Sequence, residues 1–231
     1  MGIAGVLASG EAPAVIRGML GARGIIQGGG RSLPYNAEVE WLQNVEQYQT
    51  GGPSILLPIG NIPFDEGYIV SVGFAFAMTT NEDRKGFGNL TFGMSARLGQ
   101  FRPSFGGSFM QSDVAIDTVF HEFKVERFRQ NATNDNRYWF DGNYLGLLYS
   151  NSVWDMSDFP LFLFSPTPTT RYPLRIYYFR VEQYGEAVQD YIPIRFTNEN
   201  GVSEGAMYDR VSGGLFRNQG TGYFIVGPDK R

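Results

Sequence analysis

One pattern in the sequence matches the motif that presents a nucleophilic serine in α/β hydrolases. Residues 201–205 have the sequence G-V-S-E-G and fit G-x-S-x-G. That motif needs a strand, a sharp turn and a helix, with the partner histidine later in the chain. Residues 206–209 are typical of a strand followed by a turn, and the single histidine, His121, lies upstream. The string is therefore predicted to be a turn and not a nucleophile.

General acid–base catalysis would require His121 or a pair of carboxylates. His121 alternates with apolar residues, which is typical of a core or boundary histidine with one hydrogen-bonded nitrogen. Jelly-roll glycoside hydrolases carry E-x-D-x-x-E on one strand, and that string does not occur, while Glu122 and Glu126 lie among basic residues. The absence of cysteine and the single histidine exclude thiolate and multi-histidine metal sites. We predict that the protein is not an enzyme.

Aromatic side chains beside polar ones offer a different chemistry, the binding of sugars. An aromatic ring stacks on the apolar face of a pyranose, and amide or carboxylate groups hydrogen-bond its hydroxyls. The candidate carbohydrate-binding residues are Trp139, Tyr144, Trp154, Asn134 and Asn136. Alternatively, all of these aromatic residues belong to the hydrophobic core.

Calcium binding is the one cofactor that the sequence leaves open. Residues 134–136 (N-D-N) and 155–158 (D-M-S-D) supply oxygen ligands of the kind that Ca²⁺ prefers. Neither segment has the dense, alternating carboxylates of a dedicated calcium loop, so both also fit ordinary Asx-rich turns. We predict no cofactor and no metal site, with Ca²⁺ as the alternative.

The composition predicts an all-β protein. The chain has 231 residues, of which 15% are aromatic and 30 are glycine, whereas only 18% are charged. Aromatic residues suit half-buried pleated surfaces, and glycine supplies tight turns. The net charge of −4 argues against nucleic-acid binding. The sequence contains no long apolar run of the kind that would predict a membrane span.

Period-two alternation indicates strands from residue 38 onward. In residues 68–78, large residues (Val70, Val72, Phe74, Phe76, Met78) fall on one face and small ones on the other. Residues 119–128 alternate again, and Asp141-Gly142 is a strong hairpin signal between residues 137–140 and 143–148. About a dozen short strands separated by turns predict an antiparallel two-sheet sandwich.

Residues 1–36 differ from the rest of the chain. The segment is rich in glycine, contains no aromatic residue before Tyr35, and lacks the basic region that begins a secretory signal peptide. We predict two domains, an anchoring arm at 1–36 and a sandwich at 37–231. The alternatives are an arm that packs on its own domain and an unstructured terminus. The apolar residues expected to mediate assembly are Ile16, Met19, Leu20, Ile25 and Ile26.

Two sets of segments resemble known modules. Residues 121–126 (H-E-F-K-V-E) and 138–146 (Y-W-F-D-G-N-Y-L-G) look like the paired strands of concanavalin A-like, laminin-G-type jelly rolls. The run from 174 to 228, with G-A-M-Y-D-R-V-S-G-G-L-F at 205–216, resembles the ending of lectin-like modules in phage virion proteins and gut-bacterial surface proteins. Residues 38–44 (E-V-E-W-L-Q-N) and 48–51 (Y-Q-T-G) resemble the opening of these modules.

The resemblance implies an antiparallel jelly-roll sandwich of the concanavalin A type preceded by a glycine-rich arm. It implies a non-enzymatic structural or decoration protein of a phage head or tail fibre, located in the virion. The arm would bind other virion proteins or sister subunits, and we expect a homo-oligomer. The alternative is a carbohydrate-binding adhesin or receptor-binding module that recognises host-surface glycans, on a particle or on a bacterial cell surface. A fold alone does not decide between them.

Overall fold

The computed structural model describes residues 34–44, 54–57, 67–79, 84–88, 92–105, 108–130, 133–149, 161–162 and 173–231. The regular elements in these ranges are β-strands. The described residues contain no helix long and apolar enough to cross a membrane. Residues 1–33 of the predicted arm, which contain Ile16, Met19, Leu20, Ile25 and Ile26, lie outside the described residues, as does Trp154.

The strands vary in length from two residues to twelve. They are β1 (Ala37–Glu38), β2 (Leu42–Gln43), β3 (Leu56–Leu57), β4 (Tyr68–Phe76), β5 (Arg84–Gly88), β6 (Phe92–Arg97), β7 (Gln100–Phe105), β8 (Ser108–Phe109), β9 (His121–Gln130), β10 (Thr133–Phe140), β11 (Asn143–Tyr149), β12 (Leu161–Phe162), β13 (Leu174–Gln183), β14 (Glu186–Thr197), β15 (Ser203–Asp209), β16 (Leu215–Phe216) and β17 (Ile225–Val226).

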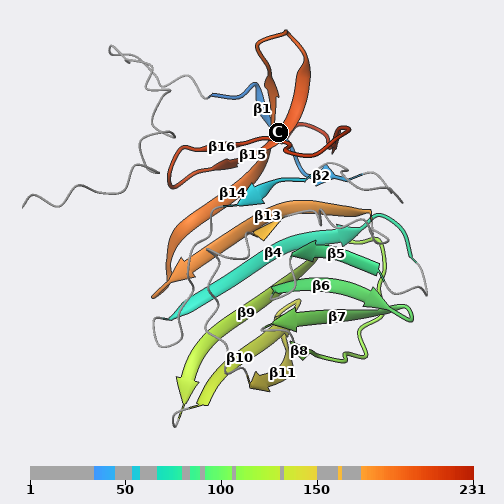
Figure 1. Cartoon of the computed structure of the whole chain (residues 1–231), viewed down its shortest axis with the longest axis vertical. Helices are drawn as coiled ribbons and strands as arrows, with labels where there is room; N and C mark the ends of the chain where they lie inside the picture. Colours follow the sequence, from blue (N-terminus) through green and yellow to red (C-terminus); the bar gives the residue numbers. More distant parts are fainter. Residues whose placement is uncertain are drawn as a thin grey trace, which may run out of the picture. The chain divides into compact units, whose positions relative to one another are not determined.

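The large sheet follows the order β11-β10-β9-β4-β13-β14-β15-β16 (Figure 1). The short strand β1 joins it at β14, and β2 joins it at β13 and carries β17. A second sheet has the order β5-β6-β7-β8, and β3 pairs with β12. Every pairing between these strands is antiparallel.

The alternation in β4 determines which face of the large sheet is the core. Val70 and Val72 lie opposite Val125 and Phe123 of β9, and cross-strand partners share a face. All four side chains are at most 1% exposed. The predicted division of this strand into a large-residue face and a small-residue face is therefore confirmed.

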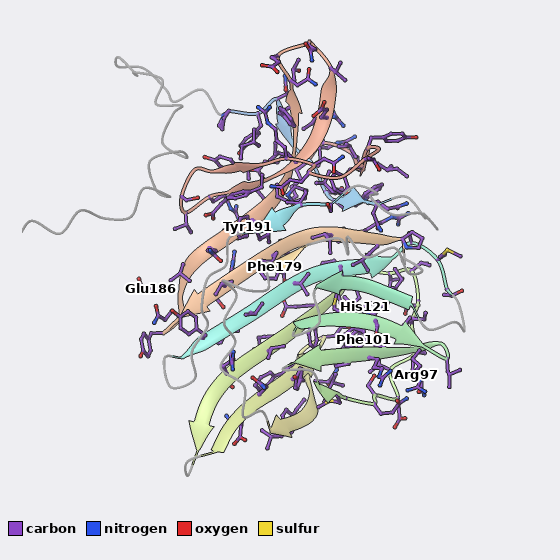
Figure 2. The ribbon with its side chains drawn as sticks, in the orientation of Figure 1. Arg97, Phe101, His121, Phe179, Glu186 and Tyr191 are labelled. Atoms are coloured by element: carbon purple, nitrogen blue, oxygen red, sulfur yellow. The ribbon has the colours of Figure 1, made fainter. Side chains whose placement is uncertain are left out.

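The two sheets pack face to face through aromatic rings. The ring centroid of Phe101, in β7, lies 5.7 Å from that of Phe74, 5.2 Å from Phe123 and 4.9 Å from Phe140. Figure 2 shows Phe101 on the smaller sheet, which lies over the strands of the large one. The all-β antiparallel sandwich of jelly-roll type predicted from the sequence is confirmed.

Two hairpins of the large sheet close through residues in the left-handed region. Asp141 and Gly142 have φ values of 49° and 75° between β10 and β11. Tyr184 and Gly185 have φ values of 51° and 86° between β13 and β14. Positive φ at both central residues is the signature of the type I′ turn. The sequence predicted the first hairpin, but Tyr-Gly gave no comparable signal for the second.

Candidate functional site

Both ring nitrogens of His121 are engaged by carboxylates. Nδ1 lies 2.7 Å from Oδ2 of Asp141, and Nε2 lies 2.8 Å from Oδ1 of Asp117. The other oxygen of Asp141 accepts the Glu122 N–H at 2.8 Å. His121 therefore ties the β10–β11 turn and the segment before β9 to the start of β9. We predicted one satisfied nitrogen, but the loop that supplies Asp117 satisfies the second.

The electrostatics of His121 follow from these contacts. Burial alone would lower its pKa, but the hydrogen bonds and charges of Asp141 and Asp117 outweigh burial and raise the pKa overall. A buried imidazole with both nitrogens bound to carboxylates has no free nitrogen with which to take a proton from a substrate. His121 is a structural residue in this geometry.

The G-x-S-x-G sequence at residues 201–205 lies at the start of a strand and not at the strand-turn-helix junction of a hydrolase. The turn before it comprises residues 198–201, where Oδ1 of Asn198 accepts the N–H groups of Asn200 and Val202, each at 2.9 Å. Ser203 then begins β15, which runs to Asp209. The predicted turn occurs a few residues earlier than expected, and residues 203–205 are strand. A strand after the serine is incompatible with the strand-turn-helix geometry of hydrolases.

Trp139 and Tyr144 come together on the face of the large sheet that points away from the smaller sheet. They are register partners in β10 and β11, and their ring centroids are 5.8 Å apart at 60°. Nζ of Lys124, opposite Trp139 in β9, lies 4.9 Å from the centre of the indole ring. Tyr144 is 57% exposed and Trp139 is half-buried. This pair presents aromatic surface to solvent.

Asn136, which the sequence predicted as a sugar ligand, does not lie on this surface. Period-two alternation places Asn136 on the same face as Tyr138 and Phe140, opposite Arg127 of β9. Asn136, Tyr138 and Arg127 are all 0% exposed, and burial lowers the pKa of Arg127 to about 9. Asn136 therefore faces the interior of the sandwich. The side chain of Asn134 and the whole of Trp154 lie outside the described residues.

A β-bulge in β13 adds two tyrosines to the outward face. Ile176 pairs with Phe74, but Tyr178 pairs with Gly73, so the register shifts by one residue. Because of the shift, Tyr177 and Tyr178 are both half-buried, whereas Ile176 and Phe179 on either side are buried. Bulges commonly re-aim side chains in this way. The doublet Tyr177-Tyr178 within an otherwise alternating strand was the available signal, and sequence reasoning missed it.

Gly73 gives Tyr178 the space that its ring occupies. A Cβ atom on Gly73 would lie 2.7 Å from Cδ1 of Tyr178 and 2.9 Å from Cε2 of Phe120. The Phe120 ring, on a side chain that is 49% exposed, meets Tyr177 edge-on with centroids 5.0 Å apart. The hydroxyl of Tyr178 donates a hydrogen bond to Oε2 of Glu122. The rings of Tyr178 and Phe120 therefore cover β4 at Gly73, and Tyr177 packs against Phe120.

The two aromatic groups are linked along β9. Glu122 and Lys124 are two residues apart and hence share a face, with Glu122 opposite Gly73 and Lys124 opposite Trp139. We call the combined surface the aromatic face; it comprises Phe120, Trp139, Tyr144, Tyr177 and Tyr178 with Glu122 and Lys124. It offers apolar ring surface together with one carboxylate and one ammonium group.

No protein-family model matches the chain, and no curated protein matches its sequence. A comparison with solved structures finds a likeness to the crystal structure of the native heptameric SAP-like pentraxin from Limulus polyphemus. The sequence identity is 8%, the match covers 66% of this chain and 80% of that chain, and the TM-score is 0.42. A likeness at this level carries no argument about ligand or assembly.

Proposed function

We propose that the protein is a non-enzymatic glycan-binding module that uses the aromatic face. The observation that carries the proposal is the concentration of partly exposed aromatic rings beside Glu122 and Lys124 on one outward sheet surface. Core aromatics normally point inward, so rings held outward by a bulge and a glycine need another explanation. Stacking on pyranose rings, with charged groups reaching the sugar hydroxyls, provides it.

The described titratable groups support binding in preference to catalysis. Asp190 accepts hydrogen bonds from Arg180 and Arg210, at 3.2 and 2.9 Å. Asp209 accepts the Asp190 N–H at 2.9 Å and the Ser212 hydroxyl at 2.6 Å. These carboxylates, like the pair around His121, are used to hold strands and turns together. Among the described residues, no three histidine or acidic side chains are grouped to hold a metal ion.

Glycan binding is tested by applying the intact chain and two variants to a panel of immobilised bacterial surface glycans. We expect saturable binding by the natural sequence and a loss of about tenfold or more for Trp139→Ala and for Phe120→Ala, because each change removes a partly exposed ring. Tyr184→Ala is the matched control, because Tyr184 is 73% exposed at the β13–β14 turn and outside the aromatic face. Absence of binding by the natural sequence, or equal binding by all variants, would contradict the proposal.

We further propose that the module is carried on a phage virion, where residues 1–36 attach it to other virion proteins or to sister subunits. The support for this location is the resemblance of residues 174–228 to the ending of phage lectin-like modules, together with the glycine-rich, apolar chemistry of residues 1–36. Deleting residues 1–33, which keeps the packing of Tyr35 on Tyr208 and the Asn36–Arg195 hydrogen bond, should abolish incorporation into particles while the sandwich stays folded, as measured by particle composition and circular dichroism. Unchanged incorporation would refute the role of the arm.

A further inference from the structure

A groove lies beside β15, on strands that do not contribute to the aromatic face. Its volume is about 480 Å³, within the roughly 300–1,000 Å³ range of small-molecule sites. It is lined by residues from β15 and from the C-terminal segment: Val202, Ser203, Glu204, Gly205, Asn218, Gly222, Tyr223, Phe224 and Val226.

The wall that carries Tyr223 is held in place by Asn218. Oδ1 of Asn218 accepts the N–H groups of Ser54 and Gly220, at 3.0 and 2.9 Å. Its Nδ2 donates to the carbonyl of Gly222 at 2.9 Å. All of these bonds are internal to the protein, so Asn218 fixes the loop. The groove is therefore preformed, which lowers the entropic cost of binding.

The floor of the groove is closed by apolar packing under Gly205. A Cβ atom on Gly205 would lie 2.5 Å from Cδ2 of Leu42 and 3.0 Å from Cγ2 of Val226. Leu42 is 0% exposed and Phe224 is 5% exposed. The glycine lets these side chains approach β15 closely, so the floor of the groove is apolar.

The rim presents an aromatic ring, a carboxylate and a hydroxyl. Tyr223 is 70% exposed, and Val202, 53% exposed, adds aliphatic surface. One oxygen of the half-buried Glu204 accepts a hydrogen bond from Nδ2 of Asn198 at 2.5 Å, and no cation among the described residues forms an ion pair with it. Ser203 is exposed at the start of β15. The rim thus presents the carboxylate of Glu204 and the hydroxyl of Ser203, which can both donate and accept hydrogen bonds.

We propose that this groove is a second saccharide-binding site. A sugar ring stacks its C–H face on Tyr223 while its hydroxyls donate to Glu204 and exchange hydrogen bonds with Ser203. A tetraalkylammonium ion would pair with Glu204 but has no hydrogen-bond acceptor, so it would not bond to the Ser203 hydroxyl. The inference deepens the proposed glycan-binding function and depends on it for the ligand class.

Two sites on one chain change how the module binds a surface. For a glycan chain long enough to reach both sites, the second contact is intramolecular and has a raised effective concentration. The avidity for such a polysaccharide would exceed the affinity for any of its monosaccharides.

The experiment uses the full chain, labelled with ¹⁵N and titrated separately with glucose, galactose, N-acetylglucosamine, rhamnose and tetramethylammonium. We expect saturable shifts of the Ser203, Gly205, Gly222 and Tyr223 amides with at least one sugar and not with tetramethylammonium. Tyr223→Ala and Glu204→Gln should weaken this response about tenfold, the effect of losing one stacking or hydrogen-bonding contact. Tyr184→Ala and Glu199→Gln are the matched controls, because both residues are exposed and neither lines the groove.

The outcomes separate the two proposals. Shifts that appear near Trp139 and Tyr144 but not at the groove would overturn the second site and leave the aromatic face standing. Sugar shifts at the groove alone would support the second site and overturn the aromatic face. A response to tetramethylammonium but to no sugar, or no response at all, would overturn the groove proposal.

Discussion

Replacing Phe101 by alanine is expected to lower the free energy of unfolding by about 3–5 kcal/mol, the usual cost of deleting a buried phenylalanine ring. Phe101 is 0% exposed and touches aromatic rings from β4, β9 and β10 of the opposite sheet. Its removal leaves a cavity between the two sheets that a packed core cannot fully collapse. Since domains are stable by only about 5–15 kcal/mol, the loss is a large share of the total. Urea denaturation measures it directly.

Leu98→Ala is the matched control for Phe101→Ala. Leu98 is 70% exposed in the turn between β6 and β7, three residues before Phe101. Its truncation should change stability by less than about 0.5 kcal/mol. A cost below about 1 kcal/mol for Phe101→Ala would contradict packing of the smaller sheet on the large one.

The sequence predicted the large sheet better than the way the two sheets meet. In β4 every second residue is large, so the face that packs against the smaller sheet can be read without knowing any partner. The position of Phe101 at the centre of the interface depends on residues in β4, β9 and β10 that are distant in sequence. Without information on pairing, Phe101 was one aromatic residue among many.

The contrast between local alternation and pairing of distant strands also explains which residues of the candidate site the sequence predicted. Trp139 and Tyr144 flank one tight turn, so their proximity follows from the hairpin signal at Asp141-Gly142. Asn136 lies in the same strand as Trp139, but it is three residues away and so points to the opposite, inner face with Tyr138. The period-two alternation of the sequence was enough to predict this. Tyr177 and Tyr178 were missed because a bulge is fixed by cross-strand register, which alternation alone does not reveal.

The C-terminal resemblance has a structural explanation in Asp209. Its Oδ1 accepts the N–H groups of Asp190 and Val211, at 2.9 and 3.2 Å, and its Oδ2 accepts the hydroxyl of Ser212 at 2.6 Å. The turn that these bonds close leads into β16, whose Phe216 packs on Tyr191. The D-R-V-S-G-G-L-F phrase therefore builds a strand connection. That is why it indicates a fold and leaves the ligand to the exposed surfaces.

The stability of the protein should fall as the pH rises above about 6.5, and His121 is the expected cause. Hydrogen bonds to Asp141 and Asp117 raise the pKa of His121 in the folded state, despite its burial. Because the pKa of His121 is higher in the folded state than in the unfolded state, protonation of His121 stabilises the fold. This stabilisation is complete below the unfolded-state pKa of 6.5 and is lost as the pH rises through the folded-state pKa. Burial would raise the pKa of Asp117, but that pKa is lowered overall in the folded protein. The stabilisation that Asp117 provides is therefore lost only in acid, below its ordinary pKa of 3.8.

The measurement is direct because the sequence contains a single histidine. A titration of the imidazole Cε1–H signal by NMR should give a midpoint above 6.5 in the folded protein. The melting temperature of the natural sequence should fall as the pH rises above 6.5, with about 2–4 °C for each kcal/mol lost, whereas His121→Gln should show a flat profile from a lower start. An imidazole midpoint below 6.5, or a variant whose melting temperature falls in parallel with that of the natural sequence, would show that the two carboxylates do not hold His121 as an imidazolium.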